Sequence, residues 1–371
     1  MIIKRSKLLK ALKLAMPGIE TGNVTMEGAD TFIFNKHFLQ SYNGNIAVSV
    51  PFQIKNKKDE PVVGAVNAKD FYNVISKFKD DKIRIIPKSN VWIAKSSTAS
   101  VEFTLIRNKT IDEILSGTNM KAMKRISPIG LINWQRISDN FIKALSICIL
   151  PGNKSKMSGI FVIGNTMLST DGVRVNQYVL ASPMGPFFWI TDKAANELMK
   201  LPITKYESTD PAWVHFSSDD GVTFSCKQLL RETFPRDRIA NMCTVKYIFK
   251  NGDITNNIPE ALLEAVNRAS VLAQNIDSHE TIKLTLDQKG IGVAAQRTSG
   301  KYYEFVPWEK PFVKGFTPIS FFVDYAMITN VIKYSKSFYI KQIEEKGQIL
   351  TRIIFVYTGG MQLIATFEEG K

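Results

Sequence analysis

Hydrophobic and polar positions follow one order along the chain, and that order occurs three times. Each copy begins with a stretch whose apolar side chains recur every three or four residues, which is the spacing of an amphipathic helix. The three stretches are Ser6–Met16, Trp134–Ile149 and Pro259–Gln274. A repeat of this length is far longer than a solenoid unit and suits a whole domain. The pattern therefore predicts three copies of one domain.

Each copy continues with paired strand patterns and a second helix that begins in the same way. An oxygen-bearing residue stands at the expected N-cap, where it accepts a hydrogen bond from a free amide of the first turn. These caps are Asn67, Thr191 and Asp324. The buried face is marked by apolar pairs at Val74-Ile75, Leu198-Met199 and Val331-Ile332. Further strand patterns follow at Lys82–Ile86, Val214–Phe216 and Phe338–Ile343.

Turn residues favour antiparallel sheets over parallel ones. Asn-Gly and Asp-Gly pairs supply the positive backbone φ angles that tight hairpins need. They occur at Asn43-Gly44, Asp171-Gly172, Asp220-Gly221 and Asn251-Gly252. We therefore expect an α+β fold in which each domain packs two helices on antiparallel sheets. Polar connectors at Arg107–Pro128 and Arg231–Val245 divide the chain into domains 1–125, 126–245 and 246–371.

The charge of the chain points to a polyanionic partner. Forty-eight Lys and Arg against 34 Asp and Glu give a formal net charge of +14, spread over the whole sequence. Nucleic acid and a membrane surface both fit this charge. No run of eighteen apolar residues and no apolar leader stretch occurs, so we expect a cytoplasmic protein without a membrane segment. Three dispersed cysteines, Cys148, Cys226 and Cys243, suit a reducing compartment.

Signatures of enzymes are weak in this sequence. Ser76–Lys79 fits S-x-x-K and Ser138–Asn140 fits S-D-N, but the K-T-G that completes the serine β-lactamase set is absent. Gly290–Ala295 fits a relaxed dinucleotide fingerprint, yet it continues as a strand pattern instead of opening a helix. The three histidines are isolated from other metal-ligating residues. We expect no cofactor, no metal site and no catalytic residue.

Several motifs resemble one family in their order and spacing. In the middle copy, Ser158–Phe161 and Leu168–Val175, with Thr170-Asp171-Gly172-Val173-Arg174, resemble a strand and T-D-G-x-R turn of bacterial sliding clamps. Phe234–Ile239 resembles the F-P-x-x-R-R-apolar link into the last clamp domain. The second helix and closing strand of that domain have counterparts at Phe321–Val331 and Met361–Phe367. The chain thus resembles the bacterial DNA polymerase III beta subunit.

The resemblance implies a ring made of six such domains from two head-to-tail protomers, with helices lining the hole. Such a homodimer encircles double-stranded DNA without reading its sequence and tethers the replicative polymerase. It is a non-catalytic processivity factor, and its partners include the clamp loader. Most members are acidic overall, whereas this chain is basic, which leaves open a member from a phage or mobile element.

Lysine and arginine on the expected helices are the candidates for contact with DNA phosphates, because weak and salt-sensitive attraction permits sliding. The loop Pro151–Lys156 resembles a family loop that touches DNA. The full set is Lys10, Lys13, Lys77, Arg136, Lys143, Lys154, Lys156, Lys193, Lys200, Arg268 and Lys333.

The resemblance also implies an apolar pocket that takes short peptides from polymerase, loader and repair proteins by anchoring Leu and Phe side chains. Three departures touch this pocket: Val173 stands where His is common, the proline link is one residue short, and Ala365-Thr366-Phe367 replaces the usual apolar-Pro-apolar ending. The implied wall is Met157, Thr170, Gly172, Val173, Arg174, Val175, Pro235, Arg238, Ile239, Leu363, Ile364 and Ala365.

Two alternatives remain open at this point. One is a non-ring clamp relative that regulates replication by binding DNA or clamp partners. Complementary free edges on the first and last domains would favour the ring instead. The other alternative is an enzyme acting on nucleic acid, which would need a metal-binding carboxylate cluster or a nucleophile beside a base.

Overall fold

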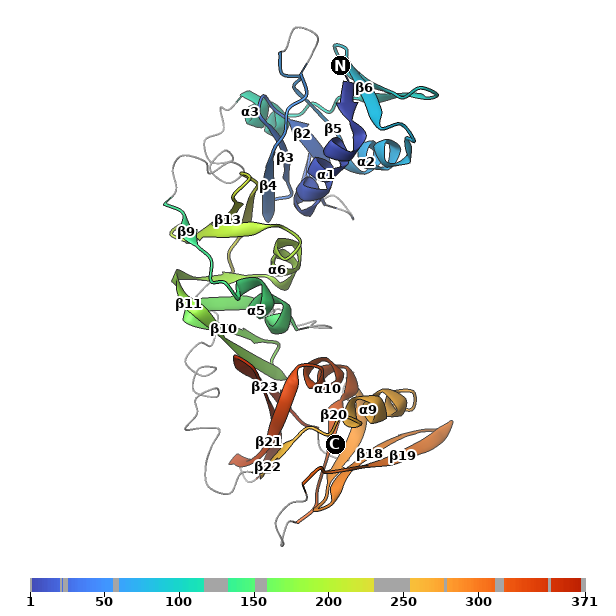
Figure 1. Cartoon of the computed structure of the whole chain (residues 1–371), viewed down its shortest axis with the longest axis vertical. Helices are drawn as coiled ribbons and strands as arrows, with labels where there is room; N and C mark the ends of the chain where they lie inside the picture. The colour runs from blue at the N-terminus through green and yellow to red at the C-terminus, as the bar shows by residue number, and fades with distance from the viewer. Residues whose placement is uncertain are drawn as a thin grey trace. The chain divides into compact units, whose positions relative to one another are not determined.

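The computed structural model describes residues 2–20, 22, 26–55, 60–116, 133–150, 159–229, 254–276, 279–310, 317–345 and 348–367. The chain forms two compact units (Figure 1). Unit 1 consists of Met1–Asp139 and Met184–Leu229, and unit 2 of Asn140–Pro183 and Leu230–Lys371. Both units combine helices with antiparallel sheets, which confirms the expected α+β fold.

Unit 1 contains a four-stranded and an eight-stranded sheet. The order β1-β6-β7-β8 joins Ile2–Lys4, Lys82–Pro87, Val91–Lys95 and Ser100–Thr104. The order β5-β2-β3-β4-β14-β13-β12-β9 joins Gly64–Asn67, Thr31–Phe34, Phe38–Tyr42, Ile46–Pro51, Thr223–Lys227, Trp213–Ser218, Ile203–Glu207 and Gln135–Arg136. The helices are α1 (Arg5–Ala15), α2 (Ala68–Lys77), α3 (Lys109–Ser116) and α6 (Asp192–Leu198), with a 3-10 turn at Met16–Gly18.

An apolar core holds the two sheets of unit 1 together. The stripe of α1 that is buried, including Leu8 and Leu12, packs on β3 and β4. The Phe34 ring on β2 lies 5.1 Å from Trp92 on β7 and 5.8 Å from Phe71 on α2, centroid to centroid. Aromatic edge contacts of this kind add to the gain from burial. The core therefore fixes α1 and α2 against both sheets.

Unit 2 contains a six-stranded sheet and a five-stranded one. The order β10-β11-β23-β22-β21-β15 joins Ile160–Thr170, Arg174–Ile190, Gly360–Ala365, Gln348–Tyr357, Ser335–Glu345 and Ile254–Asn257. The second sheet is β16-β17-β18-β19, with β20 paired to β17: Gln274–Ile276, His279–Leu286, Gly290–Arg297, Gly300–Pro307 and Ile319–Asp324. The helices are α5 (Phe141–Cys148), α9 (Leu262–Ser270) and α10 (Tyr325–Ile332).

Both sheets of the middle repeat continue into a neighbouring repeat. In unit 1, β14 pairs with β4 of the first repeat, from Cys226 opposite Ile46 to Thr223 opposite Ser49. In unit 2, the first residues of β11 pair with β23 at the end of the chain. The division into units therefore runs through the middle repeat. The three-domain division stays a prediction, because its boundaries lie outside the described residues.

The local signals read from the sequence are confirmed at most positions. Asn67, Thr191 and Asp324 each accept hydrogen bonds from first-turn amides through their side chains, as N-caps do. Gly44, Gly172 and Gly221 have φ angles of 84°, 90° and 83°, in the left-handed region that glycine tolerates. Asn251-Gly252 lies outside the described residues.

The prediction of a helix at Trp134–Ile149 is wrong for the first half of that range. Gln135 and Arg136 form strand β9, which pairs with Tyr206 and Lys205 of β12, and the helix begins only at Phe141. The Tyr206 hydroxyl donates to Gln135 Oε1 at 2.8 Å. Pairing with a strand distant in sequence therefore overrode the local helical spacing.

The first predicted connector contains a helix. A short strand also precedes the first predicted helix. Within Arg107–Pro128, α3 buries Ile111 and Ile114 against Ile33, Ala47 and Ala65. Strand β1 was also missed, because three residues are too few to show alternation. The last repeat's first helix ends at Ser270 rather than Gln274, and Gln274 begins β16.

The Thr191 cap provides a test of the local structure. We expect Thr191→Ala to lower the free energy of unfolding by about 1 kcal/mol, because the Ala194 amide loses its acceptor at 3.1 Å. Thr191→Ser keeps the hydroxyl acceptor and should retain most of the free energy of unfolding. Lys4→Ala is the control, since the Lys4 side chain makes no cap bond at α1. Urea unfolding measures all three, and equal losses in Thr191→Ala and Lys4→Ala would contradict this role of the cap.

Candidate functional site

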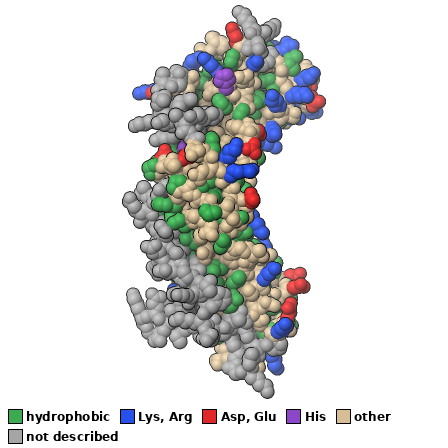
Figure 2. All heavy atoms as spheres, turned by 60° about the vertical axis from the view of Figure 1, so that its left-hand side comes forward, with side chains coloured by type: hydrophobic (Ala, Val, Ile, Leu, Met, Phe, Trp, Pro, Cys, Tyr) green, Lys and Arg blue, Asp and Glu red, His purple; other side chains and the backbone are tan. Residues whose placement is uncertain are grey.

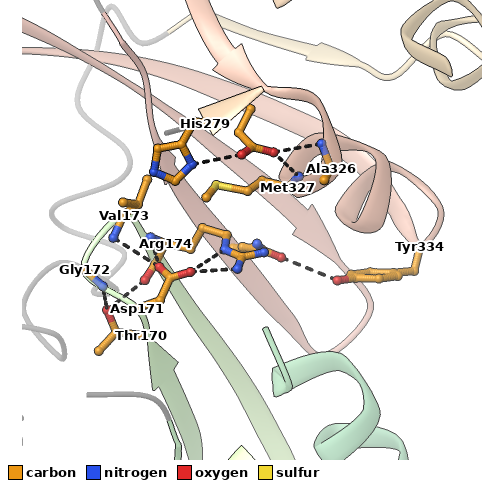
Figure 3. A network of polar contacts seen from close by, with 11 residues as sticks. Thr170, Asp171, Gly172, Val173, Arg174, His279, Ala326, Met327 and Tyr334 are labelled. Atoms are coloured by element: carbon orange, nitrogen blue, oxygen red, sulfur yellow. Dashed lines mark hydrogen bonds and ion pairs between the residues drawn. The ribbon is translucent and has the colours of Figure 1, made fainter. Parts of the chain in front are cut away.

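The turn between β10 and β11 is held by its own polar side chains (Figure 3). Asp171 Oδ1 accepts the backbone amides of Val173 and Arg174 at 3.1 and 2.7 Å. The Thr170 hydroxyl donates to the Arg174 carbonyl at 2.8 Å and accepts the Gly172 amide at 3.2 Å. The T-D-G-x-R sequence thus fixes a rigid hairpin end.

Arg174 is buried and carries a charge that needs a partner. Its relative exposure is 1%, and its Nε and Nη2 atoms lie 2.8 and 2.7 Å from Asp171 Oδ2. Loss of either partner would leave an uncompensated charge inside the protein, at a cost of about 3–5 kcal/mol. The pair therefore stabilises the end of the hairpin itself.

Strand β23 completes the sheet beside this turn. Arg174 lies opposite Ile364, Val175 lies opposite Leu363, and the Ala365 amide donates to the Val173 carbonyl at 2.9 Å. The structure thus brings the described members of the implied peptide-pocket wall together on β10, β11 and β23. Met157, Pro235, Arg238 and Ile239 lie outside the described residues.

Most of this wall faces inward. Thr170, Arg174, Val175, Leu363 and Ile364 are buried. Gly172 is exposed, and Val173 and Ala365 are half-buried. Among the described wall residues, the accessible surface is therefore the tip of the hairpin and the end of β23.

A histidine that the sequence left isolated belongs to this part of unit 2. His279 Nδ1 lies 2.9 Å from Asp324 Oδ2, and its ring is 4.9 Å from Phe367, centroid to centroid. The same carboxylate caps α10 by accepting the amides of Ala326 and Met327 (Figure 3). Phe367 pairs with Phe322 through both backbone hydrogen bonds. No local signal connects residues so far apart in the chain.

Buried polar groups tie α5 to the six-stranded sheet. Asn176 Nδ2 donates to the Ile147 carbonyl at 2.7 Å, and the Tyr357 hydroxyl donates to Asn176 Oδ1. The Tyr334 ring packs edge-on against Tyr357 at 5.1 Å. Burial raises the pKa of Tyr334 to about 12, so it stays neutral. This network adds polar contacts to the buried apolar side chains that hold α5 in place.

Exposed lysines occur on the helices as the sequence predicts. Lys10 and Lys13 lie on α1, Lys77 on α2, Lys143 on α5 and Lys193 on α6. Lys333 follows α10 directly and is exposed as well. On the face drawn in Figure 2, Lys and Arg side chains of unit 1 are dispersed among Asp and Glu and do not form one patch.

Other members of the candidate DNA-contact set lie on a strand, are paired with acids, or fall outside the described residues. Arg136 is exposed, but on strand β9 rather than on a helix. Lys200 Nζ is paired with Glu197 Oε1 at 2.7 Å. The Arg268 guanidinium contacts Glu304 at 2.7 Å and Glu264 at 3.5 Å, so local acids offset its charge. Lys154 and Lys156 lie outside the described residues.

Solved structures with this fold span the whole chain. The Streptococcus pneumoniae DNA polymerase III beta chain matches with a TM-score of 0.75 at 15% identity, over 99% of both chains. The Helicobacter pylori beta clamp bound to a DNA ligase peptide gives 0.74 at 15%, also over 99% of both. The Bacillus subtilis sliding clamp gives 0.74 at 14%, over 100% of this chain and 99% of that one. The chain has the fold of the bacterial sliding clamp. No protein-family model and no curated protein sequence matches it.

The structure also brings together a row of three polar side chains that the sequence did not reveal. Glu207, His215 and Ser225 lie opposite one another across β12, β13 and β14. His215 Nδ1 lies 2.7 Å from the Ser225 hydroxyl oxygen. Ser225 is fully buried, and the other two are buried as well. The row resembles a nucleophile with its base, but a substrate has no access to the hydroxyl.

No described helix is long and apolar enough to cross a membrane. The described part of the chain also holds no group of three or more His, Cys, Asp or Glu side chains arranged to bind a metal ion.

The buried histidine makes stability depend on pH. Burial lowers the pKa of His215 below the ordinary 6.5, although the charges of Glu207 and Asp210 partly offset this. The unfolded chain therefore takes up the proton first as pH falls. We expect the free energy of unfolding to drop below about pH 6.5, by up to about 1.4 kcal/mol per pH unit from this group.

His215→Gln should flatten that part of the pH profile in urea unfolding. His37→Gln is the matched control, because His37 is exposed on the surface of the same unit. Identical slopes for wild type and His215→Gln between pH 5 and 7 would contradict the assignment.

Proposed function

We propose that this protein is a DNA sliding clamp, a ring that encircles duplex DNA and tethers the replicative polymerase and other clamp-binding proteins. The observation that carries the proposal is the match to clamp structures over 99% to 100% of this chain. In this role the protein is a non-catalytic subunit that acts on DNA in the cytoplasm. It needs no cofactor, because holding DNA is a matter of topology.

The helix-borne lysines support contact with DNA. A clamp has to attract phosphates without reading bases, and long, exposed ammonium groups do this weakly and in a salt-dependent way. Lys10, Lys13, Lys77, Lys143 and Lys193 meet this description. With a net charge of +14, the chain also suits a polyanionic partner.

Free sheet edges on the first and last repeats support closure into a homodimer. Within the described residues, β8 and β19 each end a sheet, with a neighbouring strand on one side only. Exposed Glu102 on β8 and exposed Lys301 on β19 give the two edges opposite charges. Val271, which follows α9 in the last repeat, is 73% exposed. Unpaired edges with adjacent apolar surface favour pairing with another chain.

The hairpin tip of the middle repeat is the proposed docking point for partner peptides. Gly172, Val173 and Ala365 supply a small apolar surface on a rigid support. The Helicobacter pylori clamp, which has the same fold, binds a DNA ligase peptide. A rigid support of this kind lowers the entropic cost of capturing a short peptide.

The alternatives can be separated from the clamp by simple observations. A non-ring regulator would share the fold and stay monomeric. An enzyme would need accessible chemistry, and the Ser225, His215 and Glu207 row is buried. We therefore favour the ring.

The ring hypothesis is tested by solution mass. Light scattering at several protein concentrations should give the mass of a dimer, and the protein should stay on closed circular DNA while sliding off the same DNA once it is cut. Val271→Asp should yield a monomer that does not stay on circular DNA, because it places a charge at the proposed contact. Val179→Asp is the control, since Val179 is also exposed and lies on β11. A wild-type monomer at every concentration would defeat the ring.

Peptide docking is tested separately by calorimetry. We expect a short peptide ending in Leu and Phe to bind the wild-type protein, and Val173→Asp to weaken it about tenfold or more, because apolar anchors carry most of such binding energy. The Val179→Asp protein again serves as the control. Equal affinities for the Val173→Asp and wild-type proteins would remove the hairpin tip from the docking site.

A further inference from the structure

An open hollow of about 700 Å³ lies on the five-stranded sheet of the last repeat. It is distinct from the hairpin tip and the helix lysines, and it shares Lys301 with the free edge of β19. Its lining combines aromatic rings (Tyr303 and Phe322), lysines (Lys283 and Lys301) and side-chain amides (Gln274, Asn275 and Gln296). A hollow of this size falls in the range of small-ligand sites.

Strand register places the central side chains on one face. Phe322, Lys283, Ala294 and Tyr303 lie opposite one another in a row across β20, β17, β18 and β19. The neighbouring residues of β19 point the other way, where Tyr302 and Glu304 bond to Arg268 of α9. The row therefore lies on the face of the sheet that α9 does not cover.

The aromatic rings of β19 lie against glycine backbone. A Cβ atom at Gly292 would stand 3.3 Å from Tyr303 ring and hydroxyl atoms, and one at Gly290 would stand 2.6 Å from the Phe305 ring. Each ring thus leans over a residue without a side chain, while 69% of Tyr303 and 43% of Phe305 remain exposed. Supported rings with open surface are platforms for stacking.

The charge around the platform is positive. Lys283 Nζ lies 5.7 Å from the centre of the Phe322 ring, and Lys301 is exposed beside Tyr303. The acids nearest in register are already paired: Glu304 with Arg268 at 2.7 Å on the opposite face, Glu280 with Arg297 at 3.3 Å, and Asp324 with His279 at 2.9 Å. No acidic side chain is among the described residues that line the hollow.

We propose that this hollow binds single-stranded nucleic acid, with a base stacked on Tyr303 and its flanking phosphates near Lys283 and Lys301. Stacking platforms combined with lysines are how proteins hold single strands without sequence preference. The neighbouring amides suit hydrogen bonds to base edges. A duplex does not fit, because its bases are stacked on one another. The site lies on the face of the sheet, and its Lys301 and Tyr303 belong to β19, the end strand that the proposed ring would use.

Fluorescence anisotropy with a labelled short oligo(dT) tests the proposal on the full-length protein. Tyr303→Ala should weaken binding at least about fivefold, and Tyr303→Phe should bind like wild type, because the ring is kept. Lys301→Gln should weaken binding and reduce its salt dependence. Lys227→Gln, an exposed lysine on β14, should do neither.

Competitors separate the possible ligands. Unlabelled oligo(dT) should displace the label, whereas thymidine monophosphate and an acidic, tyrosine-containing peptide at equal concentration should not. Equal affinity of Tyr303→Ala and wild type would overturn the proposal. Displacement by the mononucleotide would overturn it in favour of a nucleotide site, and displacement by the peptide in favour of a protein-docking site. Light scattering on Tyr303→Ala and Tyr303→Phe should give the wild-type mass.

Discussion

Backbone pairing between strands of neighbouring repeats is the interaction on which this molecule depends. The β4 and β14 pair joins the first and middle repeats into an eight-stranded sheet, and the β11 and β23 pair joins the middle and last repeats into a six-stranded one. Both seams use edges that would otherwise expose unpaired amides and carbonyls. As a result, the middle repeat is shared between the two compact units, and within the described residues β8 and β19 each have a neighbouring strand on one side only.

The β11 seam also explains why the candidate peptide surface is small. An ion pair between Asp171 and Arg174 sits beneath the hairpin, where it replaces the apolar packing expected of a pocket wall. The strands that bring Thr170, Val175, Leu363 and Ile364 together also bury them. Among the described wall residues, only the tip residues Gly172, Val173 and Ala365 stay accessible. The usual histidine is replaced at that tip by Val173, which makes the surface more apolar.

The basic side chains fall into two groups, one exposed and one paired with acids. Lysines on α1, α2, α5 and α6 are exposed, while Arg268 and Lys200 are engaged by nearby acids. Among the described residues, the nucleophile-like row at Glu207, His215 and Ser225 is buried inside a sheet. Single charges therefore lie at the surface, whereas this polar row lies in the interior.

Short-range signals in the sequence determined much of this fold. The N-caps at Asn67, Thr191 and Asp324 and the glycine turns at Gly44, Gly172 and Gly221 formed as expected, because the groups involved lie within a few residues of each other. The threefold recurrence of the capped helix indicated three copies of one domain, whereas the resemblance to clamps rested on the order and spacing of motifs such as Thr170–Arg174. Tertiary structure alone decided that Gln135 and Arg136 form a strand, that α3 has a core to pack on, that most of the implied pocket wall is buried, and that His279 meets Asp324. Each of these depends on partners far away in the chain, whose pairing energy outweighs local preference and leaves no periodic trace in the sequence.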